Sequence, residues 1–245
     1  MSDNTEQKCK YAVLAFDIER SGAFASNATI GIGASFVTDD LKQVYSLYLP
    51  GYFPEDTPFE ARCYEEFWSK NLDKLEELKY KHKSNTQQSN LLTEIPNTQQ
   101  LTFQQRQKQM IVKFQLFRRK CEEYAEANNL QFELCTDNNV YDGGFINQMI
   151  MEHTDNFPIP FNTKNKYQPF WETHAQQRGL LMAIDPEFKS AWGLSKRIKE
   201  LYDLPELQVT HDHNCKHDAY TIACEQQFLL GIRDGKYKLK KESSN

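Results

Sequence analysis

Residues 11–19 (YAVLAFDIE) constrain the fold most, because this segment is almost wholly apolar until it reaches an acidic end. Such a run is typical of a strand buried on both faces of a sheet. Asp17 and Glu19 stand two residues apart, so on a strand their side chains project from the same face. Two adjacent carboxylates there are unfavourable unless a cation offsets their charge. The segment therefore predicts a central strand with a candidate metal site, although so short a pair is also compatible with two solvated carboxylates.

Two more strand patterns follow. Residues 29–37 and 43–49 are separated by the turn-like Thr38-Asp39-Asp40 and predict an antiparallel meander with the first strand. Gly31 and Gly33 lie inside a strand pattern rather than at a strand-to-helix turn, which excludes a dinucleotide-binding loop.

The remaining elements alternate helices with a strand. Apolar side chains at three- and four-residue spacing predict helices over residues 59–83 and 105–128, and a strand is expected over 130–136. Further helices are expected over 143–153, 188–204 and 217–231. This order favours a mixed α/β layer fold over a pure Rossmann array.

The length of 245 residues predicts one domain, which we place over residues 8–235. Residues 1–7 and 236–245 are expected to be polar tails. Residues 84–109 are dominated by Gln, Asn, Ser and Thr, a composition that cannot bury enough apolar surface to fold alone, so an insertion is expected there.

The net charge of −5 argues against a protein that coats nucleic acid non-specifically, because that mode needs many phosphate-neutralising cations. The charge still allows a nucleic-acid-binding groove that basic runs line locally, such as residues 118–120, 196–197 and 236–241. These runs are equally compatible with ordinary solvated surface.

The six cysteines lack a C-x-x-C pair and the dense spacing of secreted scaffolds, so they are expected to be reduced thiols. No segment has the roughly 20 apolar residues that a membrane span needs. We therefore expect a cytoplasmic, reducing location and no membrane partner.

Three of the six histidines, His211, His213 and His217, lie within seven residues of one another. One interpretation is a zinc site with Cys215, but no second Cys/His pair with suitable spacing completes a tetrahedron. The other makes Asp218 an oxygen ligand at a helix start and one histidine a general base that activates water.

Three separated segments resemble the DEDDh 3′-to-5′ exonucleases of the RNase H-like superfamily. The segment 16–22 (FDIERSG) is similar to the family's strand-borne D-x-E followed by a small residue and Gly. Residues 137–146 (DNNVYDGGFI) resemble its H-N-x-x-F-D-x-x-F-L, and residues 213–219 (HNCKHDA) resemble its H-x-A-x-x-D-A. The three matches come in the family's order, each at the expected strand end or helix start.

The resemblance implies an RNase H-like fold, with a mixed five-stranded sheet of an antiparallel meander and then parallel strands, flanked by helices. It implies an exonuclease domain that hydrolyses terminal phosphodiester bonds at the 3′ end of single-stranded DNA or RNA and releases nucleoside monophosphates. Two divalent cations, Mg²⁺ or Mn²⁺, are the implied cofactors. The implied metal ligands are Asp17, Glu19, Asp142 and Asp218; the implied catalytic residues are His213, as general base, and Glu19; and the implied substrate contacts are Ser21, Gly22 and Phe24.

Three positions depart from the family pattern. Asp137 stands where many relatives carry His and is a rival for Asp142, Cys215 replaces a small Ala, and Arg20 takes a position often held by Thr. None of these changes removes a ligand. An alternative function remains open, that of a catalytically silent module that binds nucleic acid or protein, and the resemblance leaves the oligomeric state and the choice between DNA and RNA undetermined.

Overall fold

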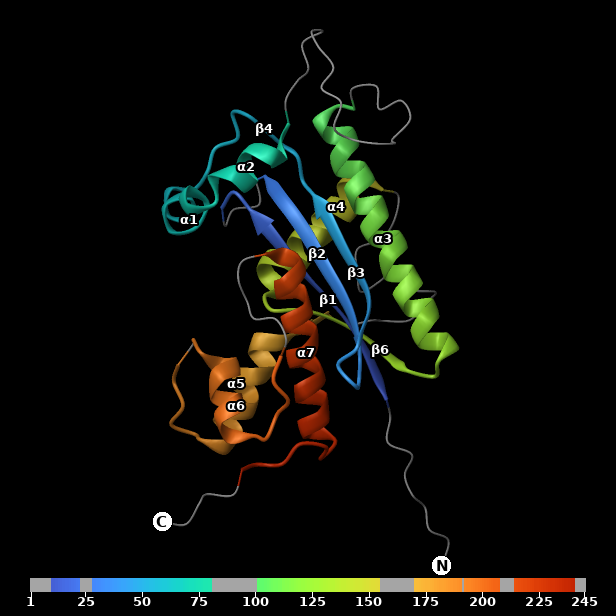
Figure 1. Cartoon of the computed structure of the whole chain (residues 1–245), viewed down its shortest axis with the longest axis vertical. Helices are drawn as coiled ribbons and strands as arrows, with labels where there is room; N and C mark the ends of the chain where they lie inside the picture. The colour runs from blue at the N-terminus through green and yellow to red at the C-terminus, as the bar shows by residue number, and fades with distance from the viewer. Residues whose placement is uncertain are drawn as a thin grey trace, which may run out of the picture.

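A five-stranded mixed sheet forms the centre of the computed structural model, which describes residues 10–22, 28–80, 101–154, 170–190, 192–207 and 214–240 (Figure 1). The strands lie in the order β3-β2-β1-β6-β7. Antiparallel pairing joins β3, β2 and β1, and parallel pairing joins β1, β6 and β7. The predicted meander followed by parallel strands is therefore confirmed. The strands are β1 (Tyr11–Arg20), β2 (Thr29–Thr38), β3 (Gln43–Pro50), β6 (Gln131–Thr136) and β7 (Phe170–Glu172), and a separate parallel pair is β4 (Phe53–Pro54) with β5 (Lys79–Tyr80).

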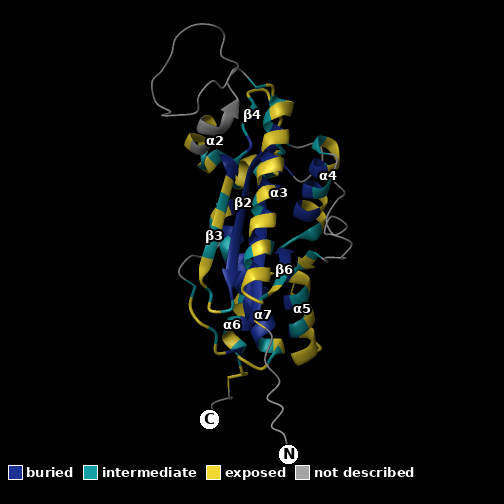
Figure 2. Cartoon of the chain, turned by 90° about the vertical axis from the view of Figure 1, so that its right-hand side faces the viewer, coloured by how far each residue is buried: buried dark blue, intermediate teal, exposed yellow. Residues whose placement is uncertain are grey.

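Helices cover both faces of the sheet (Figure 1). On one face, α3 and α4 pack against Leu14 and Phe16 of β1; on the other, α7 packs against Val13 and Ala15. Figure 2 shows the resulting burial, with exposed residues on the outer side of α3 and buried residues in the strands behind it. The helices are α1 (Ala61–Glu66), α2 (Leu72–Leu78), α3 (Phe103–Ala127), α4 (Gly144–His153), α5 (Thr173–Ile184), α6 (Leu194–Leu201) and α7 (Cys215–Arg233).

The predicted single helix over residues 59–83 is wrong. The chain there forms α1, a 3-10 turn at Trp68–Lys70, and α2, and it then enters β5. The buried indole of Trp68 donates from Nε1 to the carbonyl oxygen of Arg20 at 3.1 Å, which ties this turn to the end of β1. The anchor ends α1, because the backbone of Phe67 leaves helical geometry to place the indole there. Residues 81–83 lie outside the described residues.

The other boundaries differ less. The described part of the predicted insertion, 101–109, contains the first turns of α3, which starts at a capping box between Thr102 and Gln105. The predicted helix over 188–204 is shorter, as α6, and the sequence analysis assigned neither β7 nor α5. Residues 236–240 of the predicted polar tail pack on the domain instead: the Tyr237 ring contacts that of Phe228, and the backbone N–H of Lys240 donates to the carbonyl of Leu201.

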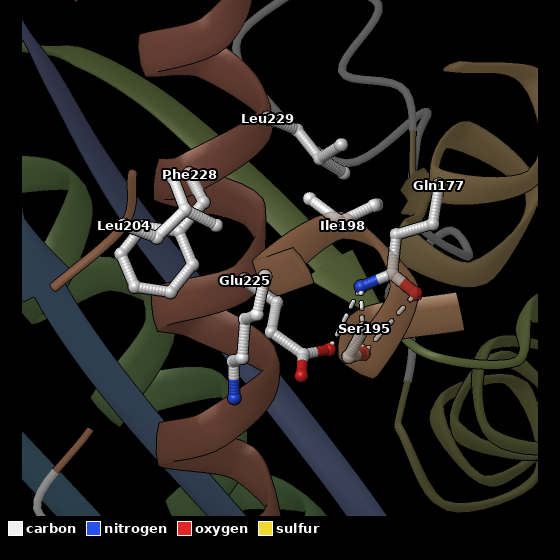
Figure 3. Close-up of a pocket in the computed structure, with 8 residues that line it drawn as sticks. Gln177, Ser195, Ile198, Leu204, Glu225, Phe228 and Leu229 are labelled. Carbon is white, nitrogen blue, oxygen red and sulfur yellow. Dashed lines mark hydrogen bonds between the residues drawn. The ribbon is translucent and has the colours of Figure 1, made fainter. Parts of the chain in front are cut away.

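A hydrogen-bonded group of polar side chains lies between α5, α6 and α7, beside a small cavity (Figure 3). The buried Gln177 donates from Nε2 to Glu225 at 2.9 Å and to Ser195 at 3.0 Å. Gln226, the buried residue that follows Glu225 in α7, forms hydrogen bonds with Thr173 at the start of α5 and with Glu133 on β6. We call these residues the amide network.

Within the described ranges, no helix is both long enough and apolar enough to span a bilayer. The five cysteines described there are all free thiols, as the spacing predicted.

Candidate metal centre

Strand β1 brings Asp17 and Glu19 to its carboxyl end, on the face covered by α7. Alternation along the strand explains this, because Val13 and Ala15 point to the same face and pack in the core beneath α7. Asp17 is buried and Glu19 is half-buried. The side chains of Asp17 and Glu19 therefore project from the same face of β1, as the sequence predicted.

Helix α7 starts directly over β2 because Gly33 leaves room for it. Gly33 and Gly31 stand opposite Asp17 and Glu19 in the strand pairing. A Cβ atom on Gly33 would lie 2.0 Å from the backbone oxygen of Cys215, so only glycine allows this approach. The side chain of Asn214 caps the helix by accepting from the N–H of Lys216. Asp218, fully buried in the first turn, thereby reaches the carboxylates of β1.

A short π-helical turn, Asn139–Gly143, carries Asp142 from the end of β6 toward β1. The side chain of Asn138 accepts from the backbone N–H groups of Val140 and Tyr141 and holds the start of this turn. The hydroxyl of Thr136, the last residue of β6, donates to Asp142 at 2.8 Å. Asp142 is thus buried and fixed at the strand-to-helix junction.

The carboxylates form two groups of three that share Asp17. Oxygen atoms of Asp17, Glu19 and Asp218 lie within 4.8 Å of one another, and so do oxygen atoms of Asp17, Asp137 and Asp142. The structure therefore brings together all four residues predicted as ligands, and adds Asp137. We call these five residues the carboxylate cluster.

Charge repulsion is strong in the carboxylate cluster. Burial raises the pKa of Asp17 well above its usual value, and the neighbouring carboxylates of Asp142, Glu19, Asp137 and Asp218 raise it further. Burial and the adjacent Asp137 likewise raise the pKa of Asp142, against the opposing hydrogen bond from Thr136. Among the described residues, none donates a hydrogen bond to the Asp17 carboxylate. Within the described ranges, Arg20 adds one positive charge that acts on Asp142, against the five carboxylates of the cluster.

The donor set fits magnesium or manganese. Both ions prefer oxygen ligands, and carboxylates are their usual protein donors. Asp17 is buried, receives no hydrogen bond from the described residues and belongs to both groups of acidic oxygens, which is an environment that a divalent cation would stabilise. Asp17, Glu19, Asp142 and Asp218 are the residues that could hold such a cation.

Several predicted residues lie elsewhere or outside the described ranges. His213 and Phe24 are not among the described residues. Ser21 is fully buried, and its hydroxyl accepts a hydrogen bond from the backbone N–H of Ala28 at 3.0 Å. Gly22 is buried beside it. The substrate contacts of Ser21, Gly22 and Phe24 remain predictions.

The zinc interpretation receives no support from Cys215. Its thiol is buried next to β2, and burial together with the carboxylates of Asp17 and Glu19 raises its pKa, which disfavours the thiolate that zinc binds. His217 is half-buried on the first turn of α7, beside the buried Asp218.

Solved structures share this fold. Product-bound exonuclease I matches with a TM-score of 0.52 and 11% identity, over 93% of this chain and 45% of that chain. Exonuclease I of E. coli with zinc and single-stranded DNA gives 0.52 and 11%, over 93% and 42%. Exonuclease I of Methylocaldum szegediense gives 0.50 and 11%, over 91% and 40%.

No family model and no curated protein matches the sequence. This chain also spans less than half the length of each exonuclease I structure named above. At 11% identity the likeness establishes architecture alone. The chain has the α/β fold of exonuclease I, with a mixed five-stranded sheet between helices.

Proposed function

We propose that this protein is a metal-dependent 3′-to-5′ exonuclease that acts on single-stranded DNA or RNA and releases nucleoside monophosphates. The observation that carries the proposal is the pair of carboxylate groups that share the buried Asp17, at the carboxyl end of β1. The exonuclease fold supports it, since the E. coli protein of that fold has been solved with a metal ion and single-stranded DNA.

In this proposal the carboxylates of Asp17, Glu19, Asp142 and Asp218 hold two Mg²⁺ or Mn²⁺ ions. When bound, such ions stabilise the charge that develops during displacement at phosphorus. A water oxygen attacks the phosphorus of the last phosphodiester. The bond from that phosphorus to the 3′ oxygen of the preceding nucleotide breaks, and the terminal nucleotide leaves as a 5′-monophosphate.

The general base follows from the family resemblance. His213 precedes Asp218 by five residues, and Asn214 fixes the start of the helix between them. His213 would accept the proton of the attacking water. Glu19 would help to orient the attacking water.

Exposed side chains beside Asp142 support a single-stranded substrate. Val140 and Tyr141 precede Asp142 in the π-helical turn and are 79% and 46% exposed. Unpaired bases stack on exposed aromatic rings, at about 1–3 kcal/mol per base. Tyr141 would therefore support a base close to the reacting phosphate.

Digestion of 5′-labelled single-stranded DNA and RNA tests the proposal, in the presence of Mg²⁺, Mn²⁺ or EDTA. We expect a ladder that shortens from the 3′ end with either metal and no cleavage in EDTA. Asp17→Asn should reduce the rate at least about 100-fold, beyond the range found for residues that only support metal ligands. Asp203→Asn removes one exposed charge outside the carboxylate cluster and serves as the matched control.

Three results would reject the proposal. Immediate release of the labelled nucleotide would show cutting from the 5′ end, and cleavage of circular single-stranded DNA would show an endonuclease. If the protein binds DNA or RNA without cleaving it, and Asp17→Asn and Asp203→Asn bind as wild type does, the catalytically silent binding module is favoured instead.

A further inference from the structure

We propose that Asp137 is a fifth carboxylate ligand, which binds the second of the two ions together with Asp17 and Asp142. This inference rests on the proposed function, since it assigns a further residue to the same metal site. In the family that the sequence resembles, this position often carries His, so the assignment comes from the geometry of this chain.

The end of strand β6 brings Asp137 close to Asp17. Strands β1 and β6 run parallel, and their pairing reaches Ala15 and Cys135. Asp137 follows directly on the last residue of β6, Thr136, at the same end of the sheet as Asp17. Neighbouring strands are about 4.8 Å apart, so the two side chains meet at the edge of the sheet.

The side-chain oxygens agree with this placement. Oxygen atoms of Asp137, Asp17 and Asp142 lie within 4.8 Å of one another. Asp142 and Asp17 are buried, whereas Asp137 is half-buried, so it closes the group from the solvent side. Three carboxylates, from β1, from the residue after β6 and from the π-helical turn, thus lie close together.

The hydrogen bonds around Asp137 do not account for this arrangement. The hydroxyl of Thr136 donates to Asp142 at 2.8 Å and lies 3.5 Å from Asp137. Asp137 and Asp142 also share a side-chain hydrogen bond, and Arg20 adds one positive charge that acts on Asp142. These contacts do not act on Asp17, whose pKa the charges of both Asp137 and Asp142 raise. Asp17 is buried and receives no hydrogen bond from the part of the chain that the structure describes, and this second observation indicates a cation at this point, independent of the clustering itself.

The consequence is a second ion held by three protein carboxylates. Affinity of oxygen sites for divalent ions rises with the number of charged ligands. Loss of Asp137 should therefore weaken one of the two ions and leave the ion at Glu19 and Asp218 nearly unchanged. Mg²⁺ dehydrates reluctantly, so the difference should be clearest with Mn²⁺.

Calorimetric titration of the full chain with Mn²⁺ tests the inference without any substrate. Wild type and the control Asp203→Asn should show two binding events. Asp137→Asn should keep one event and weaken the other at least about tenfold, the lower end of the range for supporting residues of metal sites. Asp137→Glu retains the carboxylate and should restore much of the lost affinity, and circular dichroism should show all four proteins folded.

A parallel assay measures the Mg²⁺ concentration that gives half of the maximal nuclease rate. It should rise at least about tenfold in Asp137→Asn, and the rate at saturating Mg²⁺ should recover most of its wild-type value. An alanine at this position should behave like the asparagine, because both remove the charge.

The outcomes separate the two proposals. If wild type binds two ions and cleaves DNA or RNA while Asp137→Asn binds both ions equally well, the assignment of Asp137 is wrong and the proposed function stands. Equal weakening of both events would also overturn it, since Asp137 would then act only through overall charge. If wild type binds no divalent ion, the proposed function fails and this inference fails with it.

Discussion

Two groups of buried acidic side chains lie along α7, and they are stabilised in opposite ways. At the first turn, Asp218 joins the carboxylate cluster, where carboxylates face carboxylates. About two turns later, Glu225 belongs to the amide network, where Gln177 donates to it at 2.9 Å. Glu133 on β6 contacts the amide of Gln226 in the same network (Figure 3 shows the part around Glu225).

The difference distinguishes structural from functional burial. A buried carboxylate that receives hydrogen bonds is compatible with stability, whereas one surrounded by like charges costs free energy until a cation arrives. The amide network therefore belongs to the scaffold. The carboxylate cluster is unfavourable in the protein alone, which is expected of a site whose partner is a metal ion.

Gly33→Ala should have the largest effect on activity, because it disturbs the carboxylate cluster and not the amide network. The new Cβ would collide with the backbone of Cys215 at 2.0 Å and displace the first turn of α7 with Asp218. We expect nuclease activity to fall at least about 100-fold, and the free energy of unfolding to fall by about 1–3 kcal/mol. Activity assays and urea denaturation measure both.

Gly179→Ala is its control. A Cβ on Gly179 would meet nothing within 4 Å, and alanine favours the interior of α5 by up to about 1 kcal/mol. Activity should be unchanged. Full activity in Gly33→Ala would mean that the close approach of α7 does not position Asp218.

Gln177→Met should break the amide network without affecting chemistry. Glu225 and Ser195 would each lose a hydrogen bond, at a cost of about 1–3 kcal/mol in unfolding free energy. The same exchange at Gln148, whose bond to Glu152 is solvent-exposed, should change stability by less than about 0.5 kcal/mol. A loss of activity in Gln177→Met beyond its loss of folded protein would contradict a purely structural network.

Asp17→Asn should act in the opposite direction on stability when metal is removed. In EDTA at neutral pH, the substitution removes a buried charge among like charges, so the unfolding free energy should rise. Excess Mn²⁺ should reverse the order, because only wild type gains binding energy. If Asp17→Asn is the less stable protein in EDTA, the cluster is not electrostatically strained.

The smallest expected effect is the pH dependence of the difference in unfolding free energy between wild type and Asp17→Asn in EDTA. The pKa of Asp17 is raised in the folded state above its usual 3.8, so the folded protein holds the proton more tightly between the two values. Wild-type stability should therefore fall, relative to Asp17→Asn, as pH rises through this window, and the gap should level off above the folded-state pKa. Thermal unfolding in EDTA from about pH 4 to about pH 8 measures it; a gap that does not change with pH would argue against the shift.

Sequence patterns predicted the elements whose signal is local. The strand at residues 11–19, the meander and the amphipathic α3 follow from periodicity, and so does most of α7, which was predicted to start at residue 217 but begins at Cys215. Helix α5 was missed because its buried side chains include Thr173 and Gln177, which hydrogen-bond to α7 and leave little apolar periodicity. The break near Trp68 was missed because its cause, the carbonyl of Arg20, lies 48 residues away in the chain.

The sequence by itself determined which carboxylates stand at strand ends and helix starts, and that Asp17 and Glu19 share a face. Only the tertiary structure decided which carboxylates meet. In the sequence Asp137 and Asp142 were rivals, yet the end of β6 brings Asp137 close to Asp17 while the π-helical turn brings Asp142 to the same point. Gly33, which the sequence marked only as unsuited to a dinucleotide loop, admits α7 and with it Asp218. The physical reason is that contacts between segments distant in the chain depend on register and close approach, which local patterns do not encode.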